Sequence, residues 1–396
     1  MTPDEFEPTA PGRVVRAIAG HWMFLPDLLP PSFQPDWATV QRVSEAERAL
    51  GELAASGRVL PNPMLLIRPF IRREAVESSR IEGTVTRLDQ LLLFEAGPDD
   101  GRGPADAQEV LNYVRATEFG LEQMRVGHPF SLMLIREMHR LLLEGVRGGE
   151  KRPGVVRDRG VLIGRTGQTY ETARFVPPCH TELDPLLTNL VEFLQTGGGL
   201  PVLVQLAVAH YQFETIHPFN DGNGRLGRLL ITLLLSARGV LPVPLLYLSG
   251  FFERNRDEYY DGLLDVSRRG AWNSWVAYFA YGVTVTARDA AARAGRLTDL
   301  RDNYLRRDAV RGSATLRVVD ELFASPYITL RRAADVANVA NKTAQSAITK
   351  LVGAGILREI TGQQRNRVYC ADEILALLDA PLTPTAPAPL SIPPTP

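Results

Sequence analysis

The chain has 396 residues, of which 45% are hydrophobic and 22% are charged, and its formal net charge at pH 7 is −1. A chain of this length and composition can form two or three domains, each with its own hydrophobic core. The near-neutral charge argues against a globally basic nucleic-acid-binding protein, although it leaves room for a local basic face.

Cysteine usage and the N-terminal sequence bear on the compartment. The two cysteines, Cys179 and Cys370, are far apart and show none of the spacings of a zinc site, which indicates a reducing compartment. The N-terminus lacks a basic region followed by an apolar stretch, and no apolar run reaches membrane-spanning length. We therefore expect a cytoplasmic protein without a membrane contact.

Residues 1–100 are expected to form an N-terminal helical region that begins with an irregular arm. Residues 1–35 contain seven prolines, which favours an arm laid against a core. From residue 37 to residue 55, apolar side chains recur at a period close to 3.6, which predicts an amphipathic helix. Gly57 is expected to end this helix.

A second helix is predicted over residues 69–83. Pro69 suits the first turn of a helix, where its missing N–H would have no helical partner in any case. Gly83 suits the left-handed residue that often follows a helix. The chain between these two residues is therefore expected to be one helical segment.

One face of this helix carries Ser78 and Glu82, four residues apart. Glu82 falls in the last turn, where the helix dipole disfavours a carboxylate. A nearby cation is expected to compensate. On the residues alone, Arg80 and Arg87 are the local candidates, and they would make Glu82 a solvated surface acid.

Residues 101–285 are predicted to form an all-α core. Apolar residues recur at helical spacing in four segments, 105–124, 131–145, 185–195 and 200–216. Within the last segment, His210 and Glu214 lie four residues apart, as in some metal sites. Because no third ligand is clustered with them, we expect structural polar groups that are satisfied inside the core.

Residues 152–176 interrupt the helical pattern. Short β-prone runs flank a turn rich in glycine and threonine, which predicts a β-hairpin with residues 163–176 as its best range. A small surface hairpin without a function is the alternative interpretation.

Residues 217–228 read His-Pro-Phe-Asn-Asp-Gly-Asn-Gly-Arg-Leu-Gly-Arg. The apolar run over residues 226–235 has helical length, so the glycines stand where a loop becomes a helix N-terminus, a natural anion site. His217 begins the loop and suits a general base, because an ordinary pKa near 6.5 fits abstraction of a proton at neutral pH. A glycine-rich turn that only caps a core helix is the alternative.

The residue types in this motif match the needs of a bound polyphosphate. Gly222 and Gly224 let backbone N–H groups approach an anion closely. Arg225 and Arg228 provide planar guanidiniums that match phosphate oxygens, and Asp221 can hold a divalent cation. Because all these groups occur within twelve residues, a phosphate site is the better interpretation.

The last third of the chain is predicted to form a separate module. Residues 286–311 read as a connecting helix, and residues 312–380 as a winged helix-turn-helix domain of three short helices and two strands. The tail, residues 381–396, is rich in proline, threonine and alanine and is expected to be disordered.

This module has two open interpretations. In a DNA-binding form, the third helix would enter the major groove and the wing would contact phosphates through Arg365 and Arg367. Residues 312–378 hold eight Lys or Arg against six Asp or Glu, which supports DNA binding only weakly. A protein contact, including formation of a homodimer, stays equally open.

The motif at residues 217–228 resembles the signature of the Fic family, His-x-Phe-x-Asp/Glu-Gly-Asn-Gly-Arg-x-x-Arg, at every specified position. Residues 78–83, Ser-Ser-Arg-Ile-Glu-Gly, resemble the family's inhibitory motif, Ser/Thr-x-x-x-Glu-Gly/Asn. The resemblance spans residues 35–285. It implies a mainly α fold, with a Fic-type helical core, a β-hairpin flap and an N-terminal inhibitory helix.

The same resemblance implies an activity. Fic proteins transfer a nucleoside monophosphate, usually AMP from ATP, to a hydroxyl group of a target protein. The acceptor would be a Ser, Thr or Tyr side chain, in another protein or in this one. Mg²⁺, or Mn²⁺ in its place, would be the metal cofactor.

By position in the motif, His217 would deprotonate the attacking hydroxyl and Asp221 would coordinate the metal. Phe219 would anchor the loop in the core. The residues that would bind the phosphates of the nucleotide are Gly222, Asn223, Gly224, Arg225 and Arg228.

Three further assignments follow from the resemblance. Glu82, with Ser78 and Gly83 in the inhibitory motif, would pair with Arg228 and compete with the γ-phosphate for it. Asn255 and Tyr259 would border the adenine pocket. The flap would bind a target segment along its edge through main-chain hydrogen bonds. Its residues are Ile163, Gly164, Phe175 and Val176.

Two other functions stay open. The core could remove AMP from a modified protein, with Glu82 positioning a water molecule. Alternatively, the chain could be a DNA-binding regulator whose winged helix carries the function and whose core modifies only the protein itself. The target protein, the preferred nucleotide and the oligomeric state are not determined by the sequence.

Overall fold

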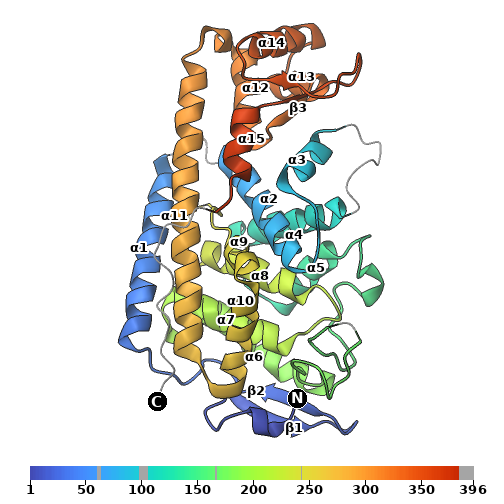
Figure 1. The fold of residues 1–396 in the computed structure, drawn as a ribbon, viewed down its shortest axis with the longest axis vertical. Helices are drawn as coiled ribbons and strands as arrows, with labels where there is room; N and C mark the ends of the chain where they lie inside the picture. The colour runs from blue at the N-terminus through green and yellow to red at the C-terminus, as the bar shows by residue number, and fades with distance from the viewer. Residues whose placement is uncertain (60–63, 98–105, 166, 242, 383–396) are drawn as a thin grey trace.

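The computed structural model describes residues 1–59, 64–97, 106–165, 167–241 and 243–382. Figure 1 shows an elongated, mainly helical molecule, with the N-terminal strands at one end and the C-terminal module at the other. The long helix α11 (Trp272–Leu305) runs between these two ends. None of the described helices is both long and apolar enough to cross a membrane.

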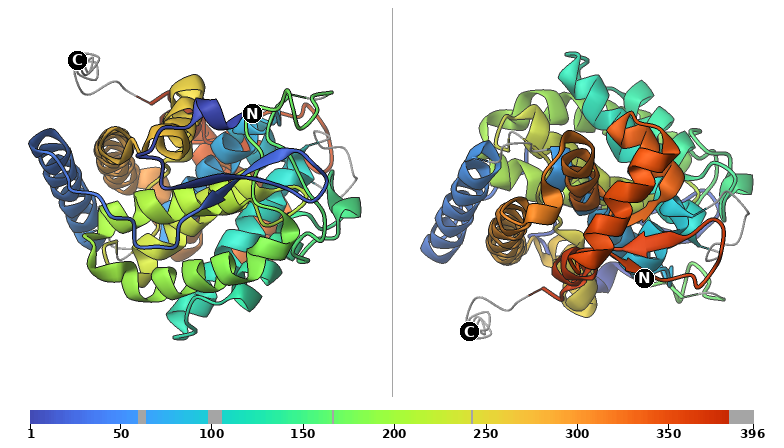
Figure 2. Two further views of the ribbon diagram at one scale, coloured as in Figure 1. Left: turned by 90° about the horizontal axis from the view of Figure 1, so that it is seen from below. Right: turned by 90° about the horizontal axis from the view of Figure 1, so that it is seen from above.

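A β-hairpin precedes the first helix. Strands β1 (Gly12–Arg16) and β2 (Trp22–Pro26) pair in antiparallel register, with Val14 opposite Phe24. The arm at residues 1–35 is therefore not irregular, as predicted, but contains a β-hairpin. The prolines stand beside and at the end of two short β-prone runs, where they do not interrupt the ladder. The hairpin lies across the lower end of the molecule in Figure 2, left.

Helix α1 (Trp37–Val59) confirms the first predicted helix and packs along α11 (Figure 1). Helix α2 (Met64–Ile81) begins five residues before Pro69, so the predicted start at residue 69 is wrong. A proline at this depth removes one helical hydrogen bond, but Phe70 and other apolar side chains of the same helix are buried and hold it together. Gly83 follows the helix with φ of +91°, as predicted.

The middle of the chain forms the predicted all-α core. Its helices are α3 (Leu88–Ala96), α4 (Ala107–Arg125), α5 (Leu132–Leu142), α6 (Leu183–Thr196), α7 (Val202–Ile216), α8 (Asn223–Ala237), α9 (Ser249–Arg254) and α10 (Arg256–Arg269). Helices α7 and α8 pack against each other and are buried over most of their length. The short loop between them, which carries the motif, is therefore fixed at both ends by the core.

The predicted β-hairpin at residues 163–176 is reduced to one residue pair. Ile163 and Phe175 exchange two backbone hydrogen bonds, of 2.9 and 3.1 Å, and form an isolated antiparallel bridge. On the far side of this pair, the carbonyl of Val176 accepts a hydrogen bond of 3.0 Å from the N–H of Phe24 in β2. The remainder of the described segment consists of turns, because its glycines and threonines favour local bonds over a ladder.

The boundary predicted at residue 286 is wrong. Residues 272–305 form one helix of 34 residues, α11, whose later part continues beyond the core to pack against α12 and α15 of the C-terminal module. The boundary was placed by a change in composition, whereas the helix keeps a buried face across that position. The core and the C-terminal module therefore share a continuous helix.

The C-terminal module contains the three predicted helices and both predicted strands. Its elements are α12 (Ser313–Ala324), β3 (Tyr327–Thr329), α13 (Leu330–Ala337), α14 (Asn341–Gly353), β4 (Arg358–Glu359), β5 (Val368–Cys370) and α15 (Asp372–Asp379). Two of them, β3 and α15, were not predicted. The strands form an antiparallel sheet in the order β3-β5-β4. Figure 2, right, views the C-terminal module from above. The winged-helix interpretation stays a prediction.

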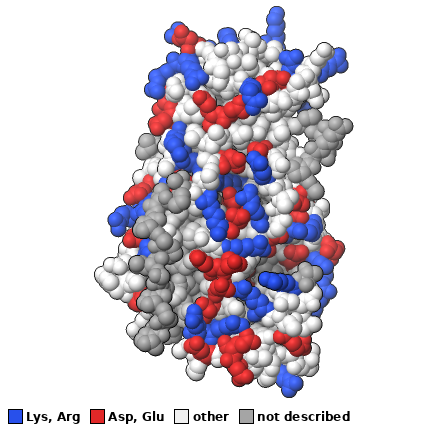
Figure 3. All heavy atoms as spheres, in the orientation of Figure 1, with Lys and Arg blue, Asp and Glu red and all other residues white. Residues whose placement is uncertain are grey.

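The charged surface matches the balanced composition. Lys and Arg side chains are interspersed with Asp and Glu side chains on the face shown in Figure 3. The two signs also alternate over the C-terminal module at the top of that view. The predicted disordered tail lies, from residue 383 onward, outside the described residues.

Candidate active site

The motif loop begins with a left-handed residue and closes on its own side chain. Helix α7 ends at Ile216, and His217 follows with φ of +49°. The side chain of Asn223, the first residue of α8, accepts from the N–H of Phe219 and donates to its carbonyl, both at 2.9 Å. Phe219 is fully buried, as expected of an anchor. Gly222, with φ of +76°, then leads directly into α8.

A buried histidine from α5 supports this loop. The N–H of Gly154 donates to Nδ1 of His139 at 2.8 Å, so the ring proton must reside on Nε2. Nε2–H then donates to the carbonyl of Asp221 at 2.9 Å, and the ring stacks on Phe219 at a centroid distance of 3.8 Å. Burial lowers the pKa of His139 to about 4, which keeps the ring neutral. The sequence assigned this residue no chemistry.

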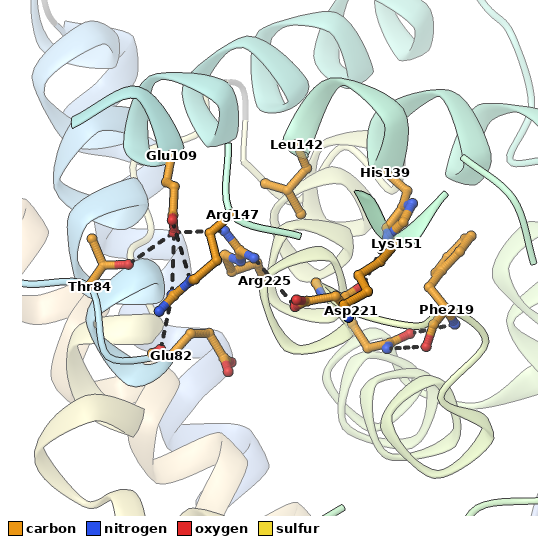
Figure 4. Close-up of polar contacts among 12 residues, drawn as sticks. Glu82, Thr84, Glu109, His139, Leu142, Arg147, Lys151, Phe219, Asp221 and Arg225 are labelled. Atoms are coloured by element: carbon orange, nitrogen blue, oxygen red, sulfur yellow. Dashed lines mark hydrogen bonds and ion pairs between the residues drawn. The ribbon is translucent and has the colours of Figure 1, made fainter. Parts of the chain in front are cut away.

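Arg225 is enclosed between two carboxylates. Its side chain is 2% exposed, and its guanidinium lies 3.3 Å from Oε2 of Glu109 on α4 and 3.7 Å from Oδ1 of Asp221. Arg147 also contacts Glu109, at 3.5 Å, and Figure 4 shows these residues as a connected set of charges. Glu109 was not predicted, because it lies 116 residues from Arg225 in the chain.

Arg228 is held by the end of α2. Its Nε donates to the hydroxyl of Ser78 and its Nη2 to the carbonyl of Ser78, both at 2.9 Å. Nη2 also lies 2.8 Å from Oε1 of Glu82, although the arginine side chain is only 1% exposed. The structure therefore brings together Arg228, Ser78 and Glu82, as the resemblance implied.

The carboxylate of Glu82 also reaches the N-terminus of α8. A Cβ added to Gly224 would lie 2.3 Å from Oε1 of Glu82, so glycine is needed for this close approach. Burial would raise the pKa of Glu82, but Arg228 outweighs it and the pKa stays below its ordinary value.

The local cations first considered for Glu82 have other partners. Arg80 pairs with Glu77, and Arg87 pairs with Asp89. The interpretation of Glu82 as a solvated surface acid balanced by these two arginines is therefore wrong. A contact distant in sequence replaces the local one, and no short-range pattern could have shown it.

His217 has the protonation pattern of a base. Its Nδ1 lies 3.3 Å from the carbonyl of Glu214, which can only accept, so Nδ1 carries the proton and Nε2 keeps its lone pair in the neutral ring. Burial, followed by the positive charge of Arg157, lowers the pKa of His217 to about 4. The imidazole is thus unprotonated and able to accept a proton at neutral pH.

The pair on α7 differs from its prediction. His210 is buried, and its Nε2 lies 2.8 Å from the hydroxyl of Tyr259, but its Nδ1 has no hydrogen-bond partner among the described residues. Glu214 likewise has a buried Oε1 without such a partner. Burial raises the pKa of Glu214 to about 7, and its Oε1 lies against Gly227. The expectation of two fully satisfied polar groups is therefore wrong for both residues.

The residues proposed for an adenine pocket engage protein groups in this structure. Tyr259 is fully buried and stacks on Phe252 at 4.4 Å between ring centroids. Asn255 donates through its side chain to the carbonyl of Phe251 at 2.9 Å, at the junction of α9 and α10. Tyr260, which follows Tyr259, is only partly buried and interacts electrostatically with Arg228 and Glu82. The adenine-pocket assignment stays a prediction.

Comparison with protein families gives two adjacent matches. Residues 40–122 match the family described as "Fic/DOC family N-terminal", and residues 129–235 match the "Fic/DOC family". The first match contains α2 with Ser78 and Glu82. The second contains the motif loop with His217 and the start of α8.

Two curated relatives are protein adenylyltransferases by name. Protein adenylyltransferase fic-1 of Caenorhabditis elegans is 32% identical over 206 residues, which cover 50% of this chain and 37% of the relative. Probable protein adenylyltransferase aq_aa38 of Aquifex aeolicus is 35% identical over 91 residues, which cover 23% of this chain and 26% of that protein. The matches thus span only 37% and 26% of the lengths of these two relatives.

Solved structures show the same fold. A Fic family protein from Desulfovibrio desulfuricans aligns with a TM-score of 0.57 at 21% identity, over 87% of this chain and 98% of that one. A fragment of Fic-1 from C. elegans aligns with a TM-score of 0.50 at 21% identity, over 66% of this chain and 74% of that one.

Proposed function

Because the chain carries the N-terminal and the central domain of the Fic/DOC family, we propose that it is a protein adenylyltransferase that moves AMP from ATP to a hydroxyl group of a target protein. The observation that carries this proposal is that Arg225, Arg228 and His217 all act electrostatically on Glu82, whose carboxylate lies at the N-terminus of α8. Both guanidiniums are almost fully buried. Each is balanced by a carboxylate, that of Glu109 for Arg225 and that of Glu82 for Arg228, and a helix N-terminus with two such cations favours a bound anion.

The N-terminus of α8 is the place that we propose for the phosphates of ATP. The first N–H groups of α8, which follow Gly222, face a loop with no capping side chain at that position. Arg225 and Arg228 add two charge-assisted donors on the same helix. We assign the α- and β-phosphates to the Asn223–Arg225 end and the γ-phosphate to Arg228.

His217 is the base for the acceptor hydroxyl. Its Nε2 accepts the proton of the hydroxyl as the hydroxyl oxygen forms a bond to the α-phosphorus of ATP. The bond from that phosphorus to the bridging oxygen breaks, and pyrophosphate leaves with the electron pair. In such a transfer the protein supplies mainly position and charge neutralisation, so no nucleophile of the protein is needed.

Asp221 fits the role of a magnesium ligand. Its side chain is 40% exposed, and Oδ1 is used by the N–H of Gly222 at 2.6 Å, which leaves Oδ2 for a cation. No cluster of three or more His, Cys, Asp or Glu occurs among the described residues, and Mg²⁺ bound with a nucleotide commonly needs only one or two carboxylates. When bound, the ion would neutralise charge on the phosphates.

Self-inhibition belongs to this proposal. Glu82 occupies both Arg228 and the space at Gly224 where a phosphate oxygen would lie. A carboxylate and a γ-phosphate cannot use one guanidinium edge at the same time. Movement of Glu82 away from Arg228 is therefore a condition for productive binding of ATP.

The flap of this chain offers one backbone edge to which a segment of the target protein could add. In the bridge between Ile163 and Phe175, the residues beside Ile163 direct their backbone groups outward. The strand segment at Val176 is already bonded to β2. A target segment would therefore add at residues 162–164 and bring its hydroxyl toward His217.

The experiment that tests the function uses the full chain with Glu82→Gly, ATP labelled at the α- or the γ-phosphate, and a cell lysate. We expect label in protein from α-labelled ATP only, and none from the Glu82→Gly, His217→Ala double variant. Label from the γ-phosphate would show a kinase reaction instead. Label that persists without His217 would overturn the role of that residue, and absence of label from any nucleoside triphosphate would contradict the proposal.

A further inference from the structure

Arg157 is a buried cation whose contacts are unlike those of the other arginines at the site. It lies in the segment between α5 and the flap, and it is 2% exposed. Its guanidinium forms no ion pair with a described residue. Instead it donates to four backbone carbonyls, those of His217 at 2.8 Å, Arg159 at 2.9 Å, Pro178 at 2.6 Å and Ile216 at 3.2 Å.

Three of the contacts of Arg157 fall on consecutive residues, the last residue of α7 and the first two of the motif loop. The guanidinium binds the carbonyls of Ile216 and His217, and the backbone N–H of Arg157 donates to the carbonyl of Pro218 at 3.0 Å. One residue therefore fixes the path of the chain before, at and after His217. No other described residue is bonded to all three.

We propose that Arg157 is a positioning residue for the reaction, which holds His217 in its left-handed conformation with Nε2 directed toward the acceptor hydroxyl. This inference rests on the proposed function of His217 as the base. It adds a residue from outside the motif, 60 positions away in the chain.

The backbone at His217 needs such support. A φ of +49° is unfavourable for a residue with a Cβ, and glycine or asparagine usually stands at this position after a helix. The last carbonyls of α7 also lack helical partners. Arg157 satisfies the carbonyl of Ile216 there, and its positive charge lies at the negative end of the helix dipole. Without it, the loop could relax to a right-handed conformation that turns the imidazole away.

The chemistry of arginine suits this task better than that of lysine. The planar guanidinium has five N–H donors in a fixed geometry, and here it serves carbonyls on several segments at once. A lysine has a single ammonium on a flexible stem and cannot span the same acceptors. The charge of Arg157 is the second contribution, after burial, to the low pKa of His217.

The test compares Arg157→Met and Arg157→Lys in the full chain with Glu82→Gly. Arg125→Met is the matched control, because Arg125 is an exposed arginine at the end of α4 that pairs with Glu122. Initial rates of AMP transfer give kcat and the KM for ATP. We expect kcat to fall on the order of 100-fold in Arg157→Met, since a misplaced reacting group has an effect of that size. The KM for ATP should change less than about threefold, because Arg225 and Arg228 are untouched.

A spectroscopic readout separates this inference from the proposed function. In protein with 15N-labelled histidine, the imidazole of His217 should report the tautomer with the proton on Nδ1, and the signal should change in Arg157→Met but not in Arg125→Met. This holds even if the parent protein transfers no AMP. A normal kcat or an unchanged His217 signal in Arg157→Met would overturn the inference. If Arg157→Met does not fold, Arg157→Lys takes its place, and a normal kcat or an unchanged His217 signal in that variant would overturn the inference.

Discussion

The carboxylate of Glu82 lies 2.8 Å from the guanidinium of Arg228, although 146 residues separate them in the chain. Glu82 follows α2, within the segment that matches the N-terminal Fic/DOC domain, whereas Arg228 belongs to α8 in the central domain. The contact is therefore a consequence of how these two segments pack. It places an acid that follows α2 against a guanidinium of α8.

Replacement of Glu82 by glycine should increase AMP transfer. The lost contact is a charge-assisted hydrogen bond, whose contribution is about 1.5–3 kcal/mol. Since about 1.4 kcal/mol corresponds to a factor of ten, the initial rate should rise roughly 10- to 100-fold. The measurement is incorporation of α-labelled ATP into protein at a fixed, subsaturating concentration of ATP.

Glu95→Ala is the control for the loss of an acid near α2. Glu95 pairs with Arg72 at 2.6 Å, away from the motif loop. Its removal should leave the transfer rate unchanged. If Glu82→Gly transferred AMP no faster than this control, the inhibitory role of Glu82 would be refuted.

Two neighbouring serines give a second, finer prediction. Ser78 accepts from Nε of Arg228 at 2.9 Å, whereas the buried hydroxyl of Ser79 has no hydrogen-bond partner among the described residues. Ser78→Ala should weaken the hold on Arg228 and raise the transfer rate by about five- to tenfold, since one such bond contributes about 1 kcal/mol or slightly more. Ser79→Ala should have little effect on the rate.

The Ser78 variant also tests coupling between Ser78 and Glu82. Because both residues hold the same guanidinium, the effects of Ser78→Ala and Glu82→Gly on the transfer rate should be less than additive in the double variant. The measurement compares the rates of the wild type, the two single variants and the double variant. Equal effects of Ser78→Ala and Ser79→Ala would argue against a specific role of the Ser78 hydroxyl.

The sequence predicted those parts of the fold and site that depend on local patterns. The period of apolar residues located α1 and the core helices, and the glycines of the motif placed the start of α8. It failed where local signals conflict. Pro69 suggested the start of a helix that begins earlier, and the β-prone runs at residues 163–176 form one bridge instead of two strands.

The supporting residues of the site could not be found in this way. His139, Glu109 and Arg157 reach the motif loop from 82, 116 and 60 residues away, respectively, so that no spacing rule connects them. A buried histidine or arginine in a helical core is also unremarkable by composition. The tertiary fold alone gives these side chains their partners.

Stability should depend on pH through His210. Burial lowers the pKa of this residue to about 3, below the value near 6.5 in the unfolded chain. Between these values the unfolded state binds a proton that the folded state does not, so stability is full above pH 6.5 and is lost as the pH falls toward 3. Over the interval from pH 6 to pH 4, the loss should be up to about 3 kcal/mol.

The measurement is the free energy of unfolding in urea at several pH values, for the wild type and for His210→Gln. His210→Gln should be less stable than the wild type at pH 7. Between pH 6 and pH 4, its free energy of unfolding should fall less steeply with pH, by an amount that corresponds to about one bound proton. His128→Gln is the control, because His128 is exposed. An identical slope in the wild type and His210→Gln would show that another group is responsible.

The open edge of the flap provides the last prediction. Ile163 is bridged to Phe175, and the carbonyl of Val176 is bonded to Phe24 of β2, so Leu162 lies on the edge of this bridge that faces away from β2. If a target adds to this edge, Leu162→Pro removes an N–H that the target would use. Leu162→Ala is the matched control, because it loses the same side chain but keeps the N–H.

For a purified target in the Glu82→Gly background, kcat/KM should be about tenfold lower with proline than with alanine, as expected for one hydrogen bond in an interface. The KM for ATP should be the same in both variants, because Arg225 and Arg228, the proposed phosphate ligands, are untouched. Equal transfer to the target by both variants would show that the target binds through side chains or at another surface.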